Sequence, residues 1–339
     1  MNRRSIRVVL PILLAAAGAF GLAPVSPAQA EPKSITIGSN PAGSVYFLLA
    51  SAFAKLFQDQ LHIHSTAQPH AGSSVYLPLM DKGEITLGMN SSLDSGLAYD
   101  GKPPYERAMK KVRAIARVWI LPYAYMAKEN SGFKTVADLK GKTVVVKFKT
   151  NVSLAQANRV ILSTAGLGEE DIKEVDSGGV VAGINMVVEG RADAATVALS
   201  MPAMRKADAT VPGGLRILGL GPKANDEFMS KGMAGLRTMH VDPSKRWPFV
   251  RQPTTIAAFD TYMNAGTSVD DATAYAMAKA MYDDWKQLQK DYAPLRNTDQ
   301  SLLTPADNPL PYHPGAVKFW KEAGIWTAEN EKHDAGLLH

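Results

Sequence analysis

Strand-like and helix-like segments alternate along most of this sequence. Short apolar or β-branched runs precede turns or segments with apolar residues at helical spacing. These runs occupy residues 34–38, 63–67, 85–89, 143–146 and 194–199. Strand-to-helix steps that repeat in this way predict parallel sheets with helices on both faces. The expected fold class is therefore α/β.

Two further segments are expected to cross between two lobes. A long apolar strand is predicted at 112–127, and a return strand at 254–262 follows a stretch without clear pattern at about 213–253. Roughly 300 residues after the N-terminal segment exceed what one hydrophobic core usually organises. We therefore expect a discontinuous first lobe, a continuous second lobe and a ligand cleft between them. The predicted ranges are 31–122 with 254–339 for the first lobe and 123–253 for the second.

The C-terminal part is predicted to be helical. Ser268 and Asp271 have the spacing of a capping box at the start of a long helix. The last predicted element runs from Ala316 to Ala323.

The first thirty residues have the pattern of an export signal. Arg3, Arg4 and Arg7 precede an apolar run that ends near Leu22, and the segment closes with Ala28-Gln29-Ala30. Proline and glycine interrupt the run, which is too short for a stable membrane span. We expect cleavage after Ala30 and a periplasmic mature chain. The arginine pair leaves general and twin-arginine export both open.

Composition excludes several classes of function. Cysteine is absent, so disulfides, thiolate metal sites and a lipid-modified cysteine are excluded. The net charge of +5 includes three arginines of the predicted signal, so the mature chain is nearly neutral. This balance argues against nucleic acid as a partner, and no later apolar run is long enough for direct membrane insertion of the mature chain.

Small polar loops follow several predicted strands. The first contains Gly43, Ser44, Val45 and Tyr46, and Ser44 either caps the next helix or contacts a ligand. Backbone N–H groups at a helix start favour an anion. Similar loops recur at Gly72-Ser73-Ser74, Asn90-Ser91-Ser92 and Thr150-Asn151-Val152-Ser153. Because the carboxyl ends of strands line the crevice in such sheets, these loops predict a site for a small, anionic solute.

Charged and aromatic residues near these loops allow two interpretations. Lys147 and Lys149 at a strand end, and Arg117 in the first crossing strand, either pair with a ligand carboxylate or face solvent. Trp119 and Tyr123 either line the cleft or fill the junction between the lobes.

Signals for catalysis are weak. Gly141-Lys142-Thr143 resembles the end of a phosphate-binding loop, but Val136 stands where that motif needs glycine. His62 and His64 are predicted on one strand face without a carboxylate cluster. We therefore expect no catalytic residue, no metal and no cofactor.

Several of these motifs together resemble the TAXI family of TRAP-transporter solute receptors. The resemblance is carried by Ile37-Gly38 with Gly43 and Tyr46, Gly72-Ser73, Asp138-Leu139-Lys140-Gly141-Lys142, Gly190-Arg191-Ala192-Asp193-Ala194, Ser200-Met201-Pro202 and Tyr312-His313-Pro314-Gly315-Ala316. It implies a type II periplasmic-binding fold that docks on sodium-coupled TRAP permease subunits. It also implies carboxylate ligands such as glutamate or 2-oxoglutarate, and a structural role for His313-Pro314-Gly315.

The sequence departs from the family pattern at two loops. Gly43-Ser44-Val45 stands where the family usually has two glycines and a threonine, and Thr150-Asn151-Val152-Ser153 replaces a Gly-Ser-Gly-Thr loop. Fewer glycines restrict the approach of the backbone to an anion, so the solute can differ from the carboxylates that the resemblance implies. The alternatives are an enzyme on the same scaffold and a ligand-sensing protein. The predicted ligand contacts are Gly43, Ser44, Val45, Tyr46, Ser73, Ser74, Asn90, Ser91, Trp119, Lys149, Thr150, Asn151, Ser153 and Ser200.

Overall fold

The computed structural model describes residues 34–339, so the predicted export signal lies outside the described residues. One sheet with strand order β2-β1-β3-β10-β4-β7-β5-β6 organises this part of the chain, with β8 on β4 and β9 on β10. The strands are β1 (Ile35–Ser39), β2 (Ser65–Pro69), β3 (Leu87–Ser91), β4 (Arg113–Lys128), β5 (Thr143–Phe148), β6 (Lys173–Ser177), β7 (Ala194–Ala198), β8 (Leu215–Ile217), β9 (Arg237–Val241) and β10 (Thr254–Ala265).

Helices follow most of the strands. They are α1 (Val45–Leu61), α2 (Ser73–Asp81), α3 (Ser92–Asp100), α4 (Ser153–Ser163), α5 (Val180–Val188), α6 (Pro202–Thr210), α7 (Asp226–Gly232), α8 (Asp271–Asp283), α9 (Trp285–Asp291), α10 (Pro314–Glu322) and α11 (Ala328–Leu338). Short 3-10 turns join some of them. The α/β class predicted from the alternation is confirmed.

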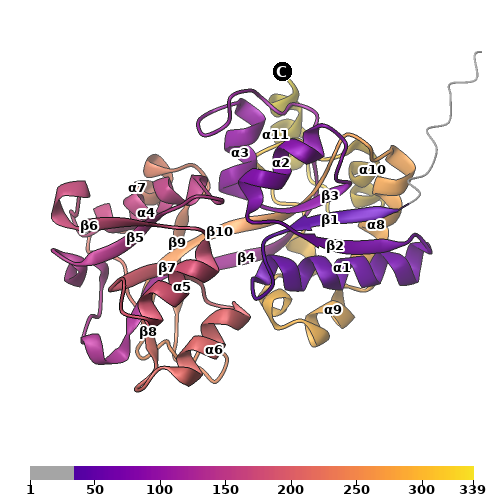
Figure 1. Ribbon diagram of the computed structural model, residues 1–339. Helices are drawn as coiled ribbons and strands as arrows, with labels where there is room; N and C mark the ends of the chain where they lie inside the picture. The colour runs from indigo at the N-terminus through magenta and orange to yellow at the C-terminus, as the bar shows by residue number, and fades with distance from the viewer. Residues whose placement is uncertain (1–33) are drawn as a thin grey trace, which may run out of the picture. The chain divides into compact units, whose positions relative to one another are not determined.

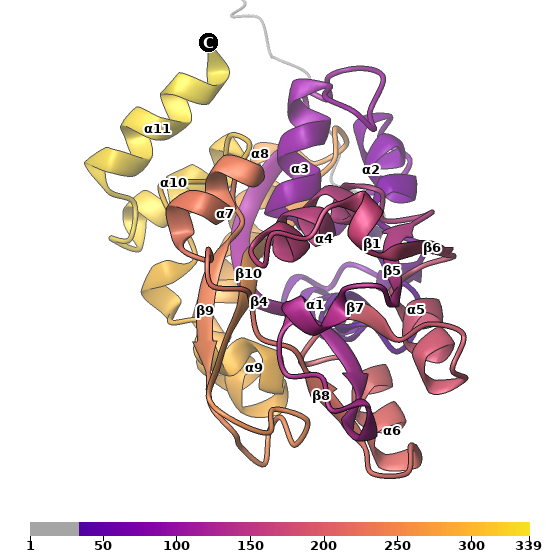
Figure 2. The ribbon, with the colours of Figure 1, turned by 90° about the vertical axis from the view of Figure 1, so that its left-hand side faces the viewer.

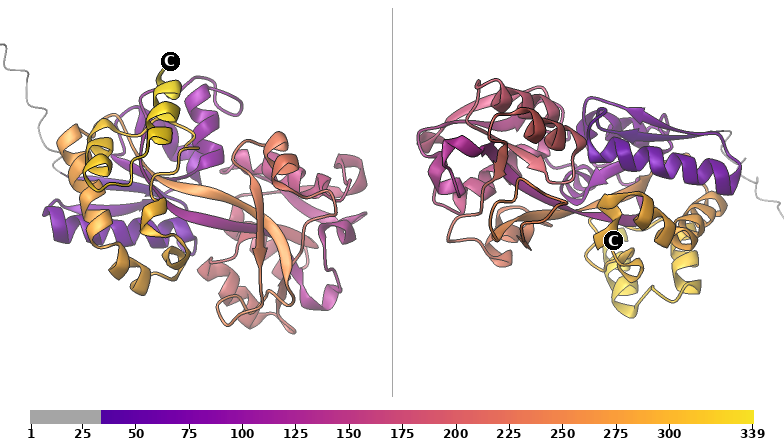
Figure 3. Two further views of the ribbon diagram at one scale, coloured as in Figure 1. Left: turned by 180° about the vertical axis from the view of Figure 1, so that it is seen from behind. Right: turned by 90° about the horizontal axis from the view of Figure 1, so that it is seen from below.

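The sheet consists of two parallel groups joined by antiparallel strands. β1 is parallel to β2 and β3, and β5 is parallel to β6 and β7. β10 and β4 lie side by side between these groups and are antiparallel to each other (Figures 1 and 3). The described residues 34–339 belong to one compact unit, and the division into lobes at 122 and 253 stays a prediction.

Helix α1 shows how the local sequence produces these steps. The Ser44 hydroxyl accepts a hydrogen bond from the Phe47 N–H (3.1 Å), which fixes the start of the helix. Leu49, Phe53 and other apolar residues at helical spacing are fully buried. The helix ends at His62, which adopts a left-handed conformation with φ of 57°. The predicted strand position of His62, and with it the shared face with His64, is therefore wrong.

The structure corrects three other predictions. The stretch at 213–253, predicted to lack a clear pattern, contains β8, α7 and β9. Strand β6, at Lys173–Ser177, was not predicted because its residues are largely polar. Helix α8 is capped by Asp270, whose carboxylate accepts from the Thr273 N–H (2.7 Å), and not by Ser268. The 316–323 element is not the last, because α11 follows α10.

A buried ion cluster lies where the two long strands meet. Arg117 of β4 and Arg237 of β9 both bond Asp260 of β10, with N–O distances of 3.4 and 2.6 Å. Asp260 and Arg117 are almost completely buried. Arg117 is therefore committed to an internal ion pair. Within residues 34–339, no helix has the length and apolar character needed to cross a membrane.

Candidate ligand-binding site

The candidate site is a cavity of about 390 Å³ at the carboxyl ends of the parallel strands. Residues one to three positions after the ends of β1, β2, β5, β6 and β7 line it, together with the last residues of β3 and β7. The lining residues from these strand ends and the helix starts after them are Asn40, Pro41, Ser44, Val45, Tyr46, Ala71, Ser73, Ser91, Asn151, Ser153, Leu154, Gly178, Gly179, Val180, Val181, Ala182, Asn185, Ala198 and Met201.

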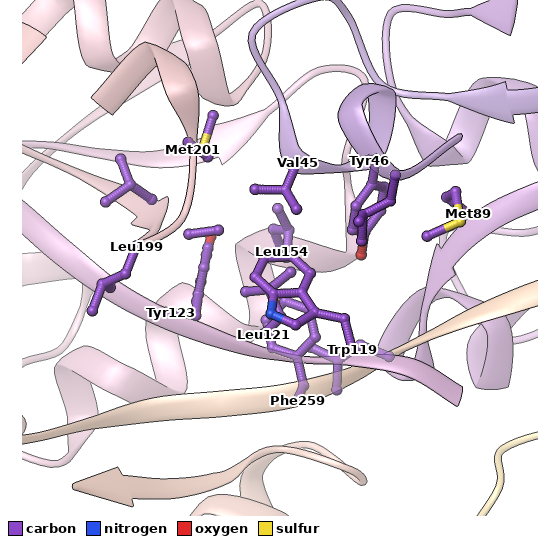
Figure 4. Packing of buried hydrophobic residues seen from close by; sticks show 14 of the residues in the cluster. Val45, Tyr46, Met89, Trp119, Leu121, Tyr123, Leu154, Leu199, Met201 and Phe259 are labelled. Carbon is purple, nitrogen blue, oxygen red and sulfur yellow. The ribbon is translucent and has the colours of Figure 1, made fainter. Parts of the chain in front are cut away.

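The remaining wall is aromatic and apolar. Trp119, Leu121 and Tyr123 of β4 and Phe259 of β10 contribute it. Figure 4 shows these side chains facing Val45 of α1. The Tyr123 hydroxyl lies between Asn158 Oδ1 (2.9 Å) and Thr196 Oγ1 (2.7 Å), so the cavity meets mainly the ring. This wall suits an apolar part of a small molecule.

Six helices begin at the cavity. The first residues or N-terminal caps of α1, α2, α3, α4, α5 and α6 all belong to its lining. A helix start has unpaired backbone N–H groups and about half a positive charge. Several helix starts around one cavity create a positive potential without a cationic side chain.

Two chain segments, residues 71–74 and residues 150–152, meet at one rim of the cavity. Thr150 Oγ1 donates to the Ala71 carbonyl (2.8 Å), and the Val152 N–H donates to Ser74 Oγ (3.3 Å). Asn151 Nδ2 donates to Ser73 Oγ (3.3 Å). Gly72 makes this approach possible, because a Cβ atom there would lie 1.9 Å from the Thr150 carbonyl oxygen. On another side, the Ala203 N–H donates to the Gly43 carbonyl (3.3 Å).

The cavity has no charged wall residue within the described part of the chain. One carboxyl group, that of Asp94 in α3, lies behind the wall and is completely buried. Burial raises the pKa of Asp94, opposed by the nearby hydroxyls of Ser73, Tyr105 and Ser153, of which that of Tyr105 donates a hydrogen bond to Oδ1 (2.6 Å). Burial also raises the pKa of Tyr46, so its hydroxyl is neutral at physiological pH.

The structure brings eight of the predicted contacts together at the cavity. These are Ser44, Val45, Tyr46, Ser73, Ser91, Trp119, Asn151 and Ser153. Ser44 is both a helix cap and a lining residue, so its two interpretations are compatible.

The other six predicted residues do not line it. Gly43 and Thr150 act in the rim contacts, and Ser74 accepts the bond from Val152. Asn90 Oδ1 accepts from Asn264 Nδ2 (3.2 Å) inside the protein. Lys149 is exposed, and Ser200 lies beside the lining residue Met201.

The wall formed by the start of α5 is not among the contacts predicted from the sequence. Gly178 and Gly179 follow the polar strand β6 and precede an apolar run from Val180 to Val188. A glycine pair before such a run is the signal that identifies this strand-to-helix step. Phe259 was assigned to a crossing strand, but its direction toward the cavity depends on strand register.

The described residues contain no group of three or more histidine, cysteine, aspartate or glutamate side chains placed to hold a metal ion.

Comparisons with known proteins identify the family and the fold. Residues 37–324 match the NMT1-like family. The alkanesulfonate-binding protein SsuA from Xanthomonas axonopodis pv. citri, bound to MOPS, is similar with 16% identity and a TM-score of 0.51, over 90% of this chain and 84% of that chain. MatC from Rhodopseudomonas palustris, with bound malate, has 13% identity and a TM-score of 0.54, over 90% and 99%. PhnD1 from Prochlorococcus marinus, in complex with methylphosphonate, has 12% identity and a TM-score of 0.51, over 87% and 100%. The fold is thus that of periplasmic solute-binding proteins.

Proposed function

This chain belongs to the NMT1-like family, and from that premise we propose that it is a periplasmic solute-binding protein that captures a small organic anion. The observation that carries the proposal is the meeting of six helix starts at one cavity. Their N–H groups and dipoles favour negative charge, and no carboxylate lies on the cavity wall among the described residues.

The proposed solute also has an apolar part. Trp119, Leu121 and Phe259 present apolar surface opposite the polar helix starts. A volume of about 390 Å³ lies at the small end of ligand pockets, which suits a metabolite with a short carbon chain or one ring. Proteins of the same fold hold MOPS, methylphosphonate and malate, which carry sulfonate, phosphonate and carboxylate groups. The proposed class is therefore small organic acids of these three kinds.

Delivery to a membrane transporter completes the proposal. The predicted signal ending at Ala30 supports export, and the sequence resemblance to TAXI receptors supports sodium-coupled TRAP permease subunits as the partner. The predicted residues at the cavity, including Ser44, Ser73 and Ser153, are the proposed ligand contacts.

A thermal-shift screen with matched pairs tests the charge requirement. The panel contains propanesulfonate with propanesulfonamide, hexanoate with hexanamide, and malate, 2-oxoglutarate, glutamate and methylphosphonate. An anion present at a hundred times its Kd is expected to stabilise the protein by about 2.7 kcal/mol, while its neutral partner has no effect.

Two variants connect the result to the cavity. Trp119→Ala is expected to reduce the stabilisation by the anion, because it removes apolar wall. Ser163→Ala at the far end of α4 is the control, since its hydroxyl donates to the Val160 carbonyl of the same helix (2.8 Å) and has no other partner among residues 34–339. Equal stabilisation by an anion and its amide, or none by any panel member, would contradict the proposal.

A further inference from the structure

The buried carboxyl group of Asp94 lies behind the cavity wall. Asp94 occupies the first turn of α3, where its N–H donates to the hydroxyl of the N-cap Ser91 (3.0 Å). Its side chain is completely buried, and it makes no ion pair among the described residues. Helix α3 contacts α2 and α4 (Figure 2). Ser73 and Ser153, the first residues of these two helices, lie near the Asp94 carboxyl group.

The two carboxyl oxygens of Asp94 have different surroundings. Oδ1 accepts a hydrogen bond from the Tyr105 hydroxyl (2.6 Å). Oδ2 is buried and has no partner with normal hydrogen-bond geometry. The hydroxyls of Ser73 and Ser153 are near enough to stabilise the ionised carboxylate, and both residues line the cavity. The hydroxyls of Ser73 and Ser153 therefore lie between Asp94 and the cavity.

Among the titratable groups around the cavity wall, Asp94 is the group whose charge changes with pH, because its neighbours stay neutral or are already paired. Tyr46 of α1, Tyr76 of α2 and Tyr105 all have pKa values raised by burial, so they stay neutral at moderate pH. Asp260 on β10, which packs on α3, is already paired with Arg117 and Arg237.

One histidine is near this group. The ring of His70 lies 5.6 Å from that of Tyr76, centroid to centroid, and partial burial lowers the pKa of His70. His70 is therefore neutral at neutral pH. A pH dependence caused by charging of His70 at low pH would persist in the variant Asp94→Asn, whereas one caused by Asp94 would not.

We propose that Asp94 is a positioning residue that couples binding of the anion to uptake of one proton. When Asp94 is ionised, Ser73 and Ser153 donate to it and turn their oxygen lone pairs toward the cavity, where they repel an anion. When Asp94 is protonated, the hydroxyls are released and donate to the anion. The carboxyl group then also ceases to oppose the positive helix starts. This inference rests on the proposed function and adds the protonation state that the site requires.

The coupling fixes the direction of the pH dependence. A bound anion raises the pKa of Asp94 further, since it favours the neutral carboxyl form. Affinity is highest below the pKa of the free protein and falls as pH rises from that value to the pKa of the complex. Within that interval one proton is taken up per anion, so the Kd rises about tenfold per pH unit.

The test is isothermal titration calorimetry between pH 4 and 9. The probe is propanesulfonate if it stabilises the wild-type protein, because its own charge is constant over this range. Otherwise the probe is the panel anion that stabilises the wild-type protein most. Titrations in two buffers of different ionisation enthalpy give the number of protons taken up, and this measurement needs no variant. Asp94→Asn keeps the shape and mimics the neutral carboxyl group.

Asp334→Asn is the matched control. Asp334 in α11 is also buried and its pKa is also raised by burial, but it bonds the Tyr312 N–H (2.7 Å) away from the cavity. Wild type and Asp334→Asn are expected to lose affinity with rising pH and to take up protons on binding. Asp94→Asn is expected to bind with the low-pH affinity at every pH, without proton uptake.

Three outcomes would overturn the coupling. They are constant wild-type affinity over the pH range without proton uptake, the same pH slope in Asp94→Asn, and loss of binding in a folded Asp94→Asn. In these cases the proposed function stands, because an anion still binds the wild-type protein. If no panel anion binds the wild-type protein at any pH, the proposed function and the coupling both fail.

Discussion

Gly72 permits the close contact between the two rim segments, and replacing it by alanine is expected to open that contact. The φ of Gly72 is 176°, an extended conformation that alanine adopts without strain, so the effect is steric alone. The added Cβ would lie 1.9 Å from the Thr150 carbonyl oxygen. Ordinary carbon–oxygen contact needs about 3.3 Å, so the segments have to separate by roughly 1.4 Å.

That separation breaks the hydrogen bonds of the rim. The bond from Thr150 to the Ala71 carbonyl (2.8 Å) and the bond from the Val152 N–H to Ser74 (3.3 Å) both stretch beyond hydrogen-bond distance. Overpacking of this kind costs about 1–3 kcal/mol. Amide hydrogen exchange at Val152 is therefore expected to accelerate roughly 5- to 150-fold, a readout that needs no ligand.

Gly178→Ala is the control on the same rim. The Gly178 carbonyl accepts from Thr150 Oγ1 (2.9 Å), but a Cβ at Gly178 would meet no atom within 4 Å. Exchange at Val152 should be unchanged in this variant. Unchanged exchange in Gly72→Ala, or equal acceleration in both variants, would refute the steric argument.

The remaining predictions concern stability and are measured by chemical or thermal unfolding. Burial raises the pKa of Asp94, so its contribution to stability is present at low pH and is lost as pH rises through the folded-state pKa. Asp94→Asn should therefore gain stability relative to wild type between pH 4 and 7, and a constant difference would contradict this. Asp260→Ala leaves Arg117 buried without its carboxylate and should cost about 3–5 kcal/mol, whereas Lys55→Ala, in an exposed pair with Asp59, should cost less than about 1 kcal/mol. Similar costs for the two would refute the role of burial.

Strand-to-helix periodicity was enough to predict the fold class. The apolar runs of β1, β3, β4 and β5 have a strong local signal, and so has the helix that follows Ser44. The strand β6 and the helix α11 were missed because their sequences are mainly polar and their positions depend on pairing or packing with distant residues.

The candidate site was predicted where local chemistry decides the position. Serines such as Ser44 and Ser91 cap helices, and caps at strand ends fall at the cavity. Lys149 was chosen for its charge, but nothing in the local sequence determines which way a side chain at a strand end points. The role inferred for Asp94 needs the contact between α3 and α4, which sequence spacing does not contain.

The pairing of β10 with β3 and β4 also determines when the cavity can form. Residues 254–265 pair with segments far earlier in the chain, and Phe259 on this strand completes the apolar wall. Contacts between such distant segments form only after a large loss of chain entropy, and we therefore expect them to form late in folding. A chain that ends before β10 still contains all six helix starts, but it lacks the strand that joins the two parallel groups. Ligand binding by truncated or newly synthesised chains would thus report completion of the whole sheet.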